Sequence, residues 1–115
     1  MQKVPFFTND PDTSGAVKLS GESLVFEWER GGVAGFSLEL SRVKTIAFQR
    51  GLLASGIFIR LREPEDLIRF PVSEKDAAVL KIARRHRDIA EQLVKDVSFS
   101  LMDSQLNDML DLTDL

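Results

Sequence analysis

Apolar and polar residues alternate along much of the chain between residues 16 and 61. Successive side chains of a β-strand point to opposite faces of the sheet, so this period of two predicts strands with one buried face. The expected strands cover residues 16–19, 24–29, 36–41, 45–49, 57–62 and 67–70, and residues 4–7 are a candidate for a seventh. Because only short turns connect them, we expect an antiparallel meander rather than parallel strands with long crossovers.

Residues 73–98 follow a different pattern, in which apolar residues recur every three or four positions. At about 100° per residue, such positions form one stripe on a helix. Ser73, followed by Glu74 and Asp76, is typical of a helix start, where a side-chain oxygen and nearby carboxylates satisfy free amides and the helix dipole. The stripe consists of Val79, Ile82, Ala83, His86, Ile89, Ala90, Leu93, Val94 and Val97. We therefore expect one long helix over residues 73–98 that covers the apolar face of the sheet.

The length of this expected helix exceeds the width of a small barrel. An unbroken helix over these residues would be about 35 to 40 Å long, whereas a barrel with strands of about six residues is roughly 20 to 25 Å across. The end of the helix would then overhang and leave Ile89, Leu93 and Val97 without a core beneath them. The pattern thus predicts that a second subunit, another protein or the chain's own tail covers these three residues.

The C-terminal tail, residues 99–115, combines acidic and large apolar residues. Asp103 is a suitable cap for a short helix in which Leu106, Met109 and Leu110 share one face. A flexible acidic linker would not need so many large apolar groups. We expect the tail helix either to pack on the domain or to bind a groove of another subunit or protein.

The order and apolar spacing of several segments resemble the PH-like superfold, particularly the bacterial PH-like and GRAM-type domains. The segments are GESLVF at residues 21–26, FSLELSRVKTI at 36–46, GIFIRL at 56–61 and LIRF at 67–70, followed by the expected helix. This resemblance implies a partly open antiparallel barrel of seven strands capped by the helix, and binding of phosphoinositides or proteins rather than catalysis. Lipid-binding members carry basic residues around the first hairpin, where this chain has Glu22 and, nearby, only Lys18, so no phosphoinositide site is carried over.

The expected architecture is therefore mostly β with a C-terminal helix, divided into three parts. They are an N-terminal arm at residues 1–15, a PH-like domain at 16–98 and the acidic amphipathic tail at 99–115. The chain has 115 residues, a net charge of −3 and no cysteine, and its tail holds four aspartates and no Lys or Arg. The near-neutral body does not favour nucleic-acid binding, which usually needs a basic face. Without cysteines or a long apolar segment, we expect a cytoplasmic protein.

Four basic residues lie within the first half of the expected helix. Lys81, Arg84, Arg85 and Arg87 lie close together in the sequence with no acidic residue among them. One interpretation is a patch that binds an anion or an acidic partner, including the chain's own tail. The alternative is a solvated helix face stabilised by ion pairs one turn apart.

The segment between two glycines at residues 51–56 contains two leucines, Leu52 and Leu53, next to Arg50. These leucines either fold back over the end of the barrel or form an exposed apolar loop. An exposed loop would suit insertion into a membrane surface, with Arg50 near the lipid headgroups.

No combination of residues indicates catalysis, a metal site or a cofactor. His86 is the single histidine, and no nucleophile, paired carboxylate or further metal ligand can be assigned to it. We expect His86 to be packed in the core. The first functional hypothesis is a non-enzymatic module for protein binding or self-association, with a homo-oligomer or protein partner. The second is a peripheral membrane module that uses the Leu52 and Leu53 loop.

Overall fold

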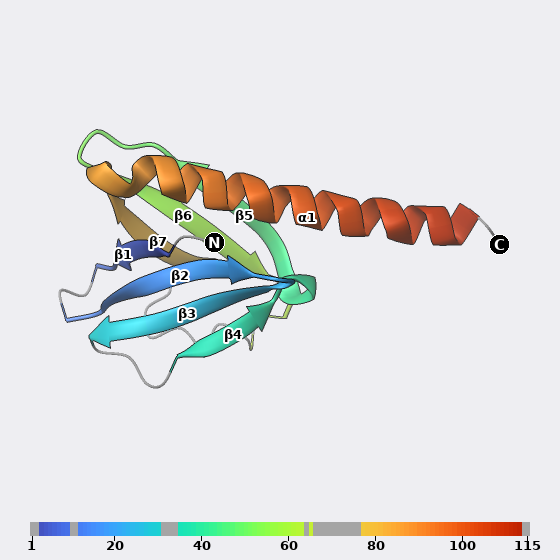
Figure 1. Cartoon of the computed structure of the whole chain (residues 1–115), viewed down its shortest axis with the longest axis horizontal. Helices are drawn as coiled ribbons and strands as arrows, with labels where there is room; N and C mark the ends of the chain where they lie inside the picture. Colours follow the sequence, from blue (N-terminus) through green and yellow to red (C-terminus); the bar gives the residue numbers. More distant parts are fainter. Residues whose placement is uncertain (1–2, 10–11, 31–34, 64, 66–76, 114–115) are drawn as a thin grey trace.

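The computed structural model of the chain describes residues 3–9, 12–30, 35–63, 65 and 77–113, and the side chains of residue 30 and residues 104–113 lie outside this description. The expected strand at residues 67–70 and the expected helix start at Ser73 also lie outside the described residues. The strands are β1 Val4–Phe7, β2 Ser14–Ser20, β3 Ser23–Arg30, β4 Phe36–Glu39, β5 Val43–Gln49, β6 Ala54–Leu61 and β7 Ala77–Ala83. Among the described residues, the 3-10 helix η1 Leu40–Arg42 precedes β5, and the 3-10 helix η3 Arg84–His86 precedes the helix α1 Arg87–Thr113 (Figure 1).

The seven described strands form one antiparallel sheet in the order β4-β3-β2-β1-β7-β6-β5. The edge strands β4 and β5 lie at opposite ends of this order, yet only the three residues of η1 connect them. The sheet must therefore curl until its two edges approach each other at η1, which gives a partly open barrel. The tight β2–β3 turn contains Gly21 at a φ of 59°, a conformation that is unfavourable for residues with a Cβ atom. This architecture confirms the expected mostly-β fold and is consistent with a PH-like open barrel capped by a helix.

The inward faces of the strands build one core. Phe26 is fully buried at the centre of an aromatic cluster, with its ring 5.0 Å from Phe36, 6.3 Å from Trp28 and 6.4 Å from Phe6. Phe6 belongs to β1, so the segment expected as an N-terminal arm is instead an integral strand of the sheet. The alternation that predicted β2 to β6 reflects this inward packing directly.

The first part of the expected long helix is wrong, because Ala77–Ala83 is strand β7. Ala78, Leu80 and Ile82 point into the core, while the residues between them are less buried. A short segment of this composition is compatible with either a helix or a strand. Its backbone pairing with β6 and β1 shows that it is a strand. The helix consequently begins at Arg87.

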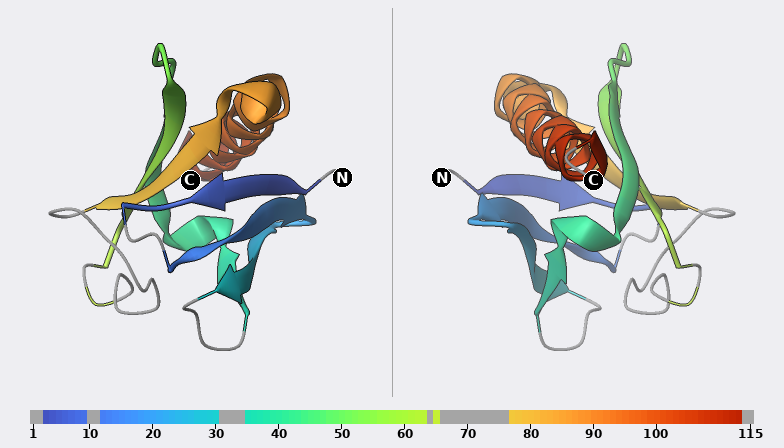
Figure 2. Two further views of the ribbon diagram at one scale, coloured as in Figure 1. Left: turned by 90° about the vertical axis from the view of Figure 1, so that its left-hand side faces the viewer. Right: turned by 90° about the vertical axis from the view of Figure 1, so that its right-hand side faces the viewer.

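Helix α1 covers the concave side of the sheet (Figure 2). Ala90, Leu93, Val94 and Val97 are buried in the same core as the strands, and Ile89 packs against that core. The prediction that Ile89, Leu93 and Val97 need a second subunit or the tail to cover them is therefore wrong. Since the helix starts later than expected, the part assigned to the overhang lies over the sheet.

The C-terminal tail is a direct continuation of α1 rather than a separate short helix. Figure 1 shows α1 extending beyond the ends of the strands toward the C-terminus. The molecule is accordingly elongated, with extents of 52 × 29 × 25 Å. The tail backbone does not fold back onto the domain, and the alternative in which the tail packs on its own sheet is not observed for the described residues.

Candidate functional site

The loop between β5 and β6, residues 50–53, carries the most exposed large apolar side chains among the described residues. Leu52 is 93% exposed and Leu53 is 92% exposed. The turn is tight: a Cβ atom on Gly51 would clash with the carbonyl oxygen of Ala54. The Gly51 amide also donates a hydrogen bond to the Ser55 hydroxyl at 3.4 Å. The loop thus presents both leucines to solvent, as one of the two sequence-based alternatives proposed.

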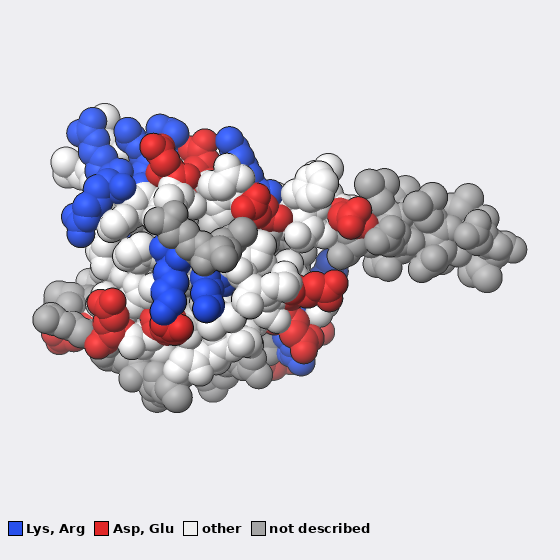
Figure 3. Space-filling model, viewed as in Figure 1, with Lys and Arg blue, Asp and Glu red and all other residues white. Residues whose placement is uncertain are grey.

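Basic residues surround the junction of β7 and α1 at the same end of the molecule. Arg84 and Arg85 are exposed in η3, and Arg87, the first residue of α1, is partly exposed. Lys81 lies on β7 and is also partly exposed. In Figure 3, blue side chains gather where Figure 1 places η3 and the start of α1. The cluster is therefore at a strand-to-helix junction and not on one face of a helix. We refer to residues 50–53, η3 and Arg87 together as the hairpin end.

An ion pair connects the loop to α1. Arg50 donates from Nε to a carboxylate oxygen of Glu91 at 3.0 Å, and its Nη2 lies 2.9 Å from the same oxygen. Asp88 is 3.9 Å from Arg50, and Lys95 is 3.5 Å from Glu91. The hydrogen bond from Arg50 holds the pKa of Glu91 below its ordinary value. These contacts fix the base of the leucine loop against the helix.

Replacing Glu91 with glutamine is expected to destabilise the protein at neutral pH and to have little effect in acid. The pKa of Glu91 is lower in the folded state than its ordinary value of 4.5. Its ionic stabilisation is therefore present above that value and is lost as the pH falls through the folded-state pKa. Urea unfolding of both proteins at about pH 7 and about pH 3 measures the difference. Glu29→Gln, at an exposed carboxylate on β3, is the control, and an equal difference at both pH values would contradict the expectation.

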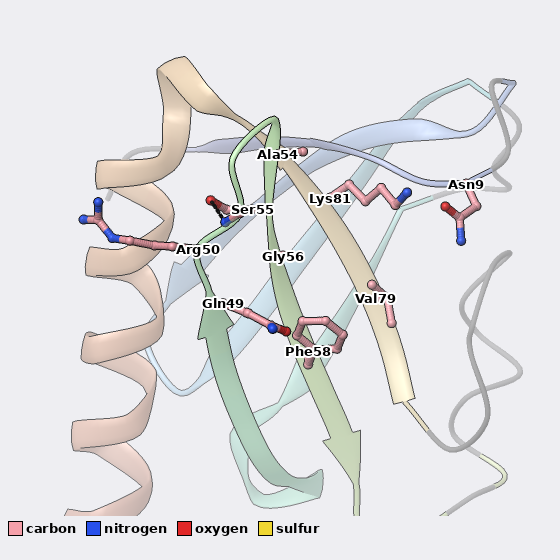
Figure 4. A pocket seen from close by; sticks show the side chains of 10 residues that line it. Asn9, Gln49, Arg50, Ala54, Ser55, Gly56, Phe58, Val79 and Lys81 are labelled. Atoms are coloured by element: carbon pink, nitrogen blue, oxygen red, sulfur yellow. Dashed lines mark hydrogen bonds between the residues drawn. The ribbon is translucent and has the colours of Figure 1, made fainter.

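A shallow pocket of about 460 Å³ lies beside the loop, on the outer face of the sheet (Figure 4). Phe58 and Val79, which face each other on β6 and β7, form its apolar wall. Its lining residues are Asn9, Gln49, Arg50, Gly51, Ala54, Ser55, Gly56, Phe58, Val79 and Lys81. In Figure 4 the Arg50 side chain points toward α1, consistent with its ion pair, and Lys81 points toward Asn9. The pocket combines the Lys81 amine, for which the described residues provide no ion-pair partner, with neutral polar groups. It is therefore suited to a polar or anionic group rather than to a large apolar ligand.

The remaining predicted site residues do not join the hairpin end. His86 lies in η3 and is only half-buried, so its expected place in the core is wrong. Leu106, Met109 and Leu110 follow in the projecting part of α1, away from the basic cluster. The described backbone of the tail therefore lies away from the basic run of its own chain. Among the described residues, no three His, Cys, Asp or Glu side chains gather closely enough to bind a metal ion.

Sequence patterns did not identify the pocket, which depends on the register between β6 and β7. Gly56 pairs with Lys81, and Phe58 pairs with Val79. The only signal in the sequence was that Phe58 and Val79 alternate with residues that point into the core. This alternation places their own side chains on the outer face of the sheet. That signal could not be used while residues 77–83 were expected to be helical.

No helix within the described residues is long and apolar enough to cross a membrane. Comparisons with family models, with curated proteins and with solved structures find no match to this chain.

Proposed function

We propose that this chain is a non-enzymatic binding module of the PH-like type whose hairpin end docks on an anionic membrane surface. The observation that carries the proposal is the exposure of Leu52 at 93% and Leu53 at 92% at the tip of one hairpin. Monomeric proteins rarely present large apolar groups together without a binding role. As part of the same proposal, we place the protein on the cytoplasmic side, where anionic lipids give the membrane a negative surface potential.

The chemistry of the hairpin end matches a lipid interface in two ways. Full burial of a leucine contributes about 1.5 to 3 kcal/mol, and insertion into the headgroup boundary recovers part of this. Each nearby Lys or Arg adds about 1 kcal/mol at an anionic surface. Arg84 and Arg85 are exposed beside the loop, so the two contributions act together. The combined affinity is expected to be modest and reversible, comparable with a single lipid anchor.

A general anionic surface fits this chain better than a specific phosphoinositide. The β2–β3 turn, where the resemblance would place phosphate contacts, has the exposed Glu22 and not a basic residue. The basic groups lie instead at η3, next to the leucine loop. Protein binding through Leu93 and Val97 is disfavoured because both are buried in the chain's own core.

The test is co-sedimentation with vesicles of phosphatidylcholine containing about 30% phosphatidylserine, compared with phosphatidylcholine alone. We expect binding only to the anionic vesicles, and a decrease when salt screens the basic residues. Leu52→Asp and Leu53→Asp are each expected to weaken partitioning by about tenfold, since each removes an inserted apolar group and adds like charge to the interface.

Thr45→Asp is a charge-matched control for these variants. Thr45 is exposed on β5 and pairs with Arg60 across the sheet, so an aspartate there adds the same charge without touching the loop. It is expected to bind anionic vesicles like the parent protein. Absence of binding by the parent, or equal binding by the Leu52→Asp variant, would refute the membrane function.

A further inference from the structure

The outer face of the sheet has a gap at Gly56. This glycine is the middle residue of a row across three strands, between Gln49 of β5 and Lys81 of β7. Residues paired in one row point their side chains to the same face of the sheet, and the Cα atoms of the two outer residues are about 10 Å apart. Because glycine has no side chain, only backbone lies between the two long polar side chains. This gap forms part of the pocket of about 460 Å³ (Figure 4).

One side of the pocket is apolar. The Phe58 ring leans over Gly56, because a Cβ atom at position 56 would lie only 3.0 Å from Cε2 of that ring. Val79 pairs with Phe58 in the next row of the sheet. Both side chains are only partly buried, so they keep apolar surface that faces the pocket. An occupant with an apolar part removes this surface from water, which a small inorganic ion cannot do.

The other side of the pocket carries a single uncompensated positive charge. Within the part of the chain that the structure describes, Lys81 has no ion-pair partner, whereas Arg50, the other cation of the lining, lies 2.9 Å from a carboxylate oxygen of Glu91. In Figure 4 the Lys81 side chain points toward Asn9. One positive charge matches the single negative charge of a carboxylate. A phosphate monoester carries about −1.5 to −2 at neutral pH and would remain partly unneutralised.

We propose that this pocket binds a small organic acid with one carboxylate and a compact apolar body. The carboxylate oxygens accept hydrogen bonds from the Lys81 ammonium and the Asn9 amide nitrogen, and the apolar body lies on Phe58 and Val79. The volume is within the usual range of small-molecule sites, about 300 to 1,000 Å³. Since the pocket is shallow, we expect a dissociation constant of about 0.1 to 1 mM. The site lies on the outer face of the sheet and does not need the side chains of the leucine loop, so it is independent of membrane docking.

Titration of the isotope-labelled full chain with phenylacetate, followed by amide NMR, measures the binding. We expect saturable shifts at Gly56 and its neighbours, and at least about tenfold weaker binding of acetate, which lacks the apolar body, and of phenylacetamide, which lacks the charge. Lys81→Gln is expected to weaken phenylacetate binding by at least about tenfold. Lys44→Gln removes the same charge from an exposed position on β5 outside the pocket lining and is expected to leave the dissociation constant within about twofold. The amide spectrum of each variant shows that the sheet remains folded.

Parallel titrations with inorganic phosphate and with glycerophosphoserine, a soluble lipid headgroup, test the class of ligand. Both are expected to bind at least about tenfold more weakly than phenylacetate, and tighter binding of either would overturn the assignment to a carboxylate. The absence of saturable shifts with phenylacetate, or equal binding by the parent protein and Lys81→Gln, would overturn the site itself. These titrations contain no membrane, so their outcome is separate from that of vesicle co-sedimentation.

Discussion

Val97→Asp is expected to lower the free energy of unfolding by about 4 kcal/mol or more at neutral pH. Val97 is fully buried where α1 meets the sheet. An aspartate there must either hold an unpaired charge in the core or become protonated, and protonating a carboxyl with an ordinary pKa at about pH 7 costs about 4 kcal/mol. Urea unfolding monitored by circular dichroism and by the single tryptophan measures the loss.

Val97→Asn separates the charge from the change in shape. The amide has nearly the same size as the carboxyl group but does not ionise, so its destabilisation should not depend on pH in the same way. A buried aspartate has a raised pKa. The additional loss of unfolding free energy in Val97→Asp, relative to Val97→Asn, should therefore shrink as the pH falls to about 3, where the carboxyl is mostly protonated in both the folded and the unfolded state. Two variants of equal stability at neutral pH would mean that α1 does not pack on the sheet through this residue.

Phe26→Ala is expected to destabilise the protein by about 3 to 5 kcal/mol, the usual loss for a fully buried phenylalanine. Phe26 lies at the centre of the aromatic cluster, with Phe36 at 5.0 Å and Trp28 at 6.3 Å. Its removal leaves a cavity whose walls belong to several strands and cannot collapse together. The total free energy of unfolding of a domain is about 5 to 15 kcal/mol, so this loss would be a large fraction of it.

Phe7→Ala is the matched control for this variant. It removes the same atoms from β1, but Phe7 is 39% exposed, so the expected loss is about 1 kcal/mol. Thermal and urea unfolding of both variants give the comparison. A similar loss at the two positions would show that the aromatic cluster around Phe26 does not form the centre of the core.

The strands were predictable where one face is buried and the other is exposed. Leu24 and Phe26 point inward and Glu27 points outward. The alternation of apolar and charged residues in the sequence therefore shows the two-residue period of a strand. The segment Ala77–Ala83 does not show such contrast, because alanines occupy both faces. Its assignment depends on partners far away in the chain, which no local pattern contains.

The candidate site was predictable only in part for the same reason. Leu52 and Leu53 stand out because two leucines in a turn conflict with ordinary turn composition. The neighbourhood of this loop was not predictable, since Arg50 meets Glu91 only after the helix has been placed over β5. Leu93 and Val97 were wrongly predicted to lie beyond the core, because the strand at Ala77–Ala83 was taken for the start of the helix.

The position of β1 in the sheet has a consequence for how the protein is made. β1, which is synthesised before the other described strands, pairs with β2 on one side and, through Phe7 and Lys81, with β7 on the other. β1 and β2 can associate early, but the connection to β6 and β5 through β7 must wait until residue 83 has been synthesised. Contacts between the two ends of a chain slow folding because the long intervening loop must close first. During synthesis, therefore, one side of β1 remains an open edge, and the nascent chain exposes its core until the final strand and helix arrive.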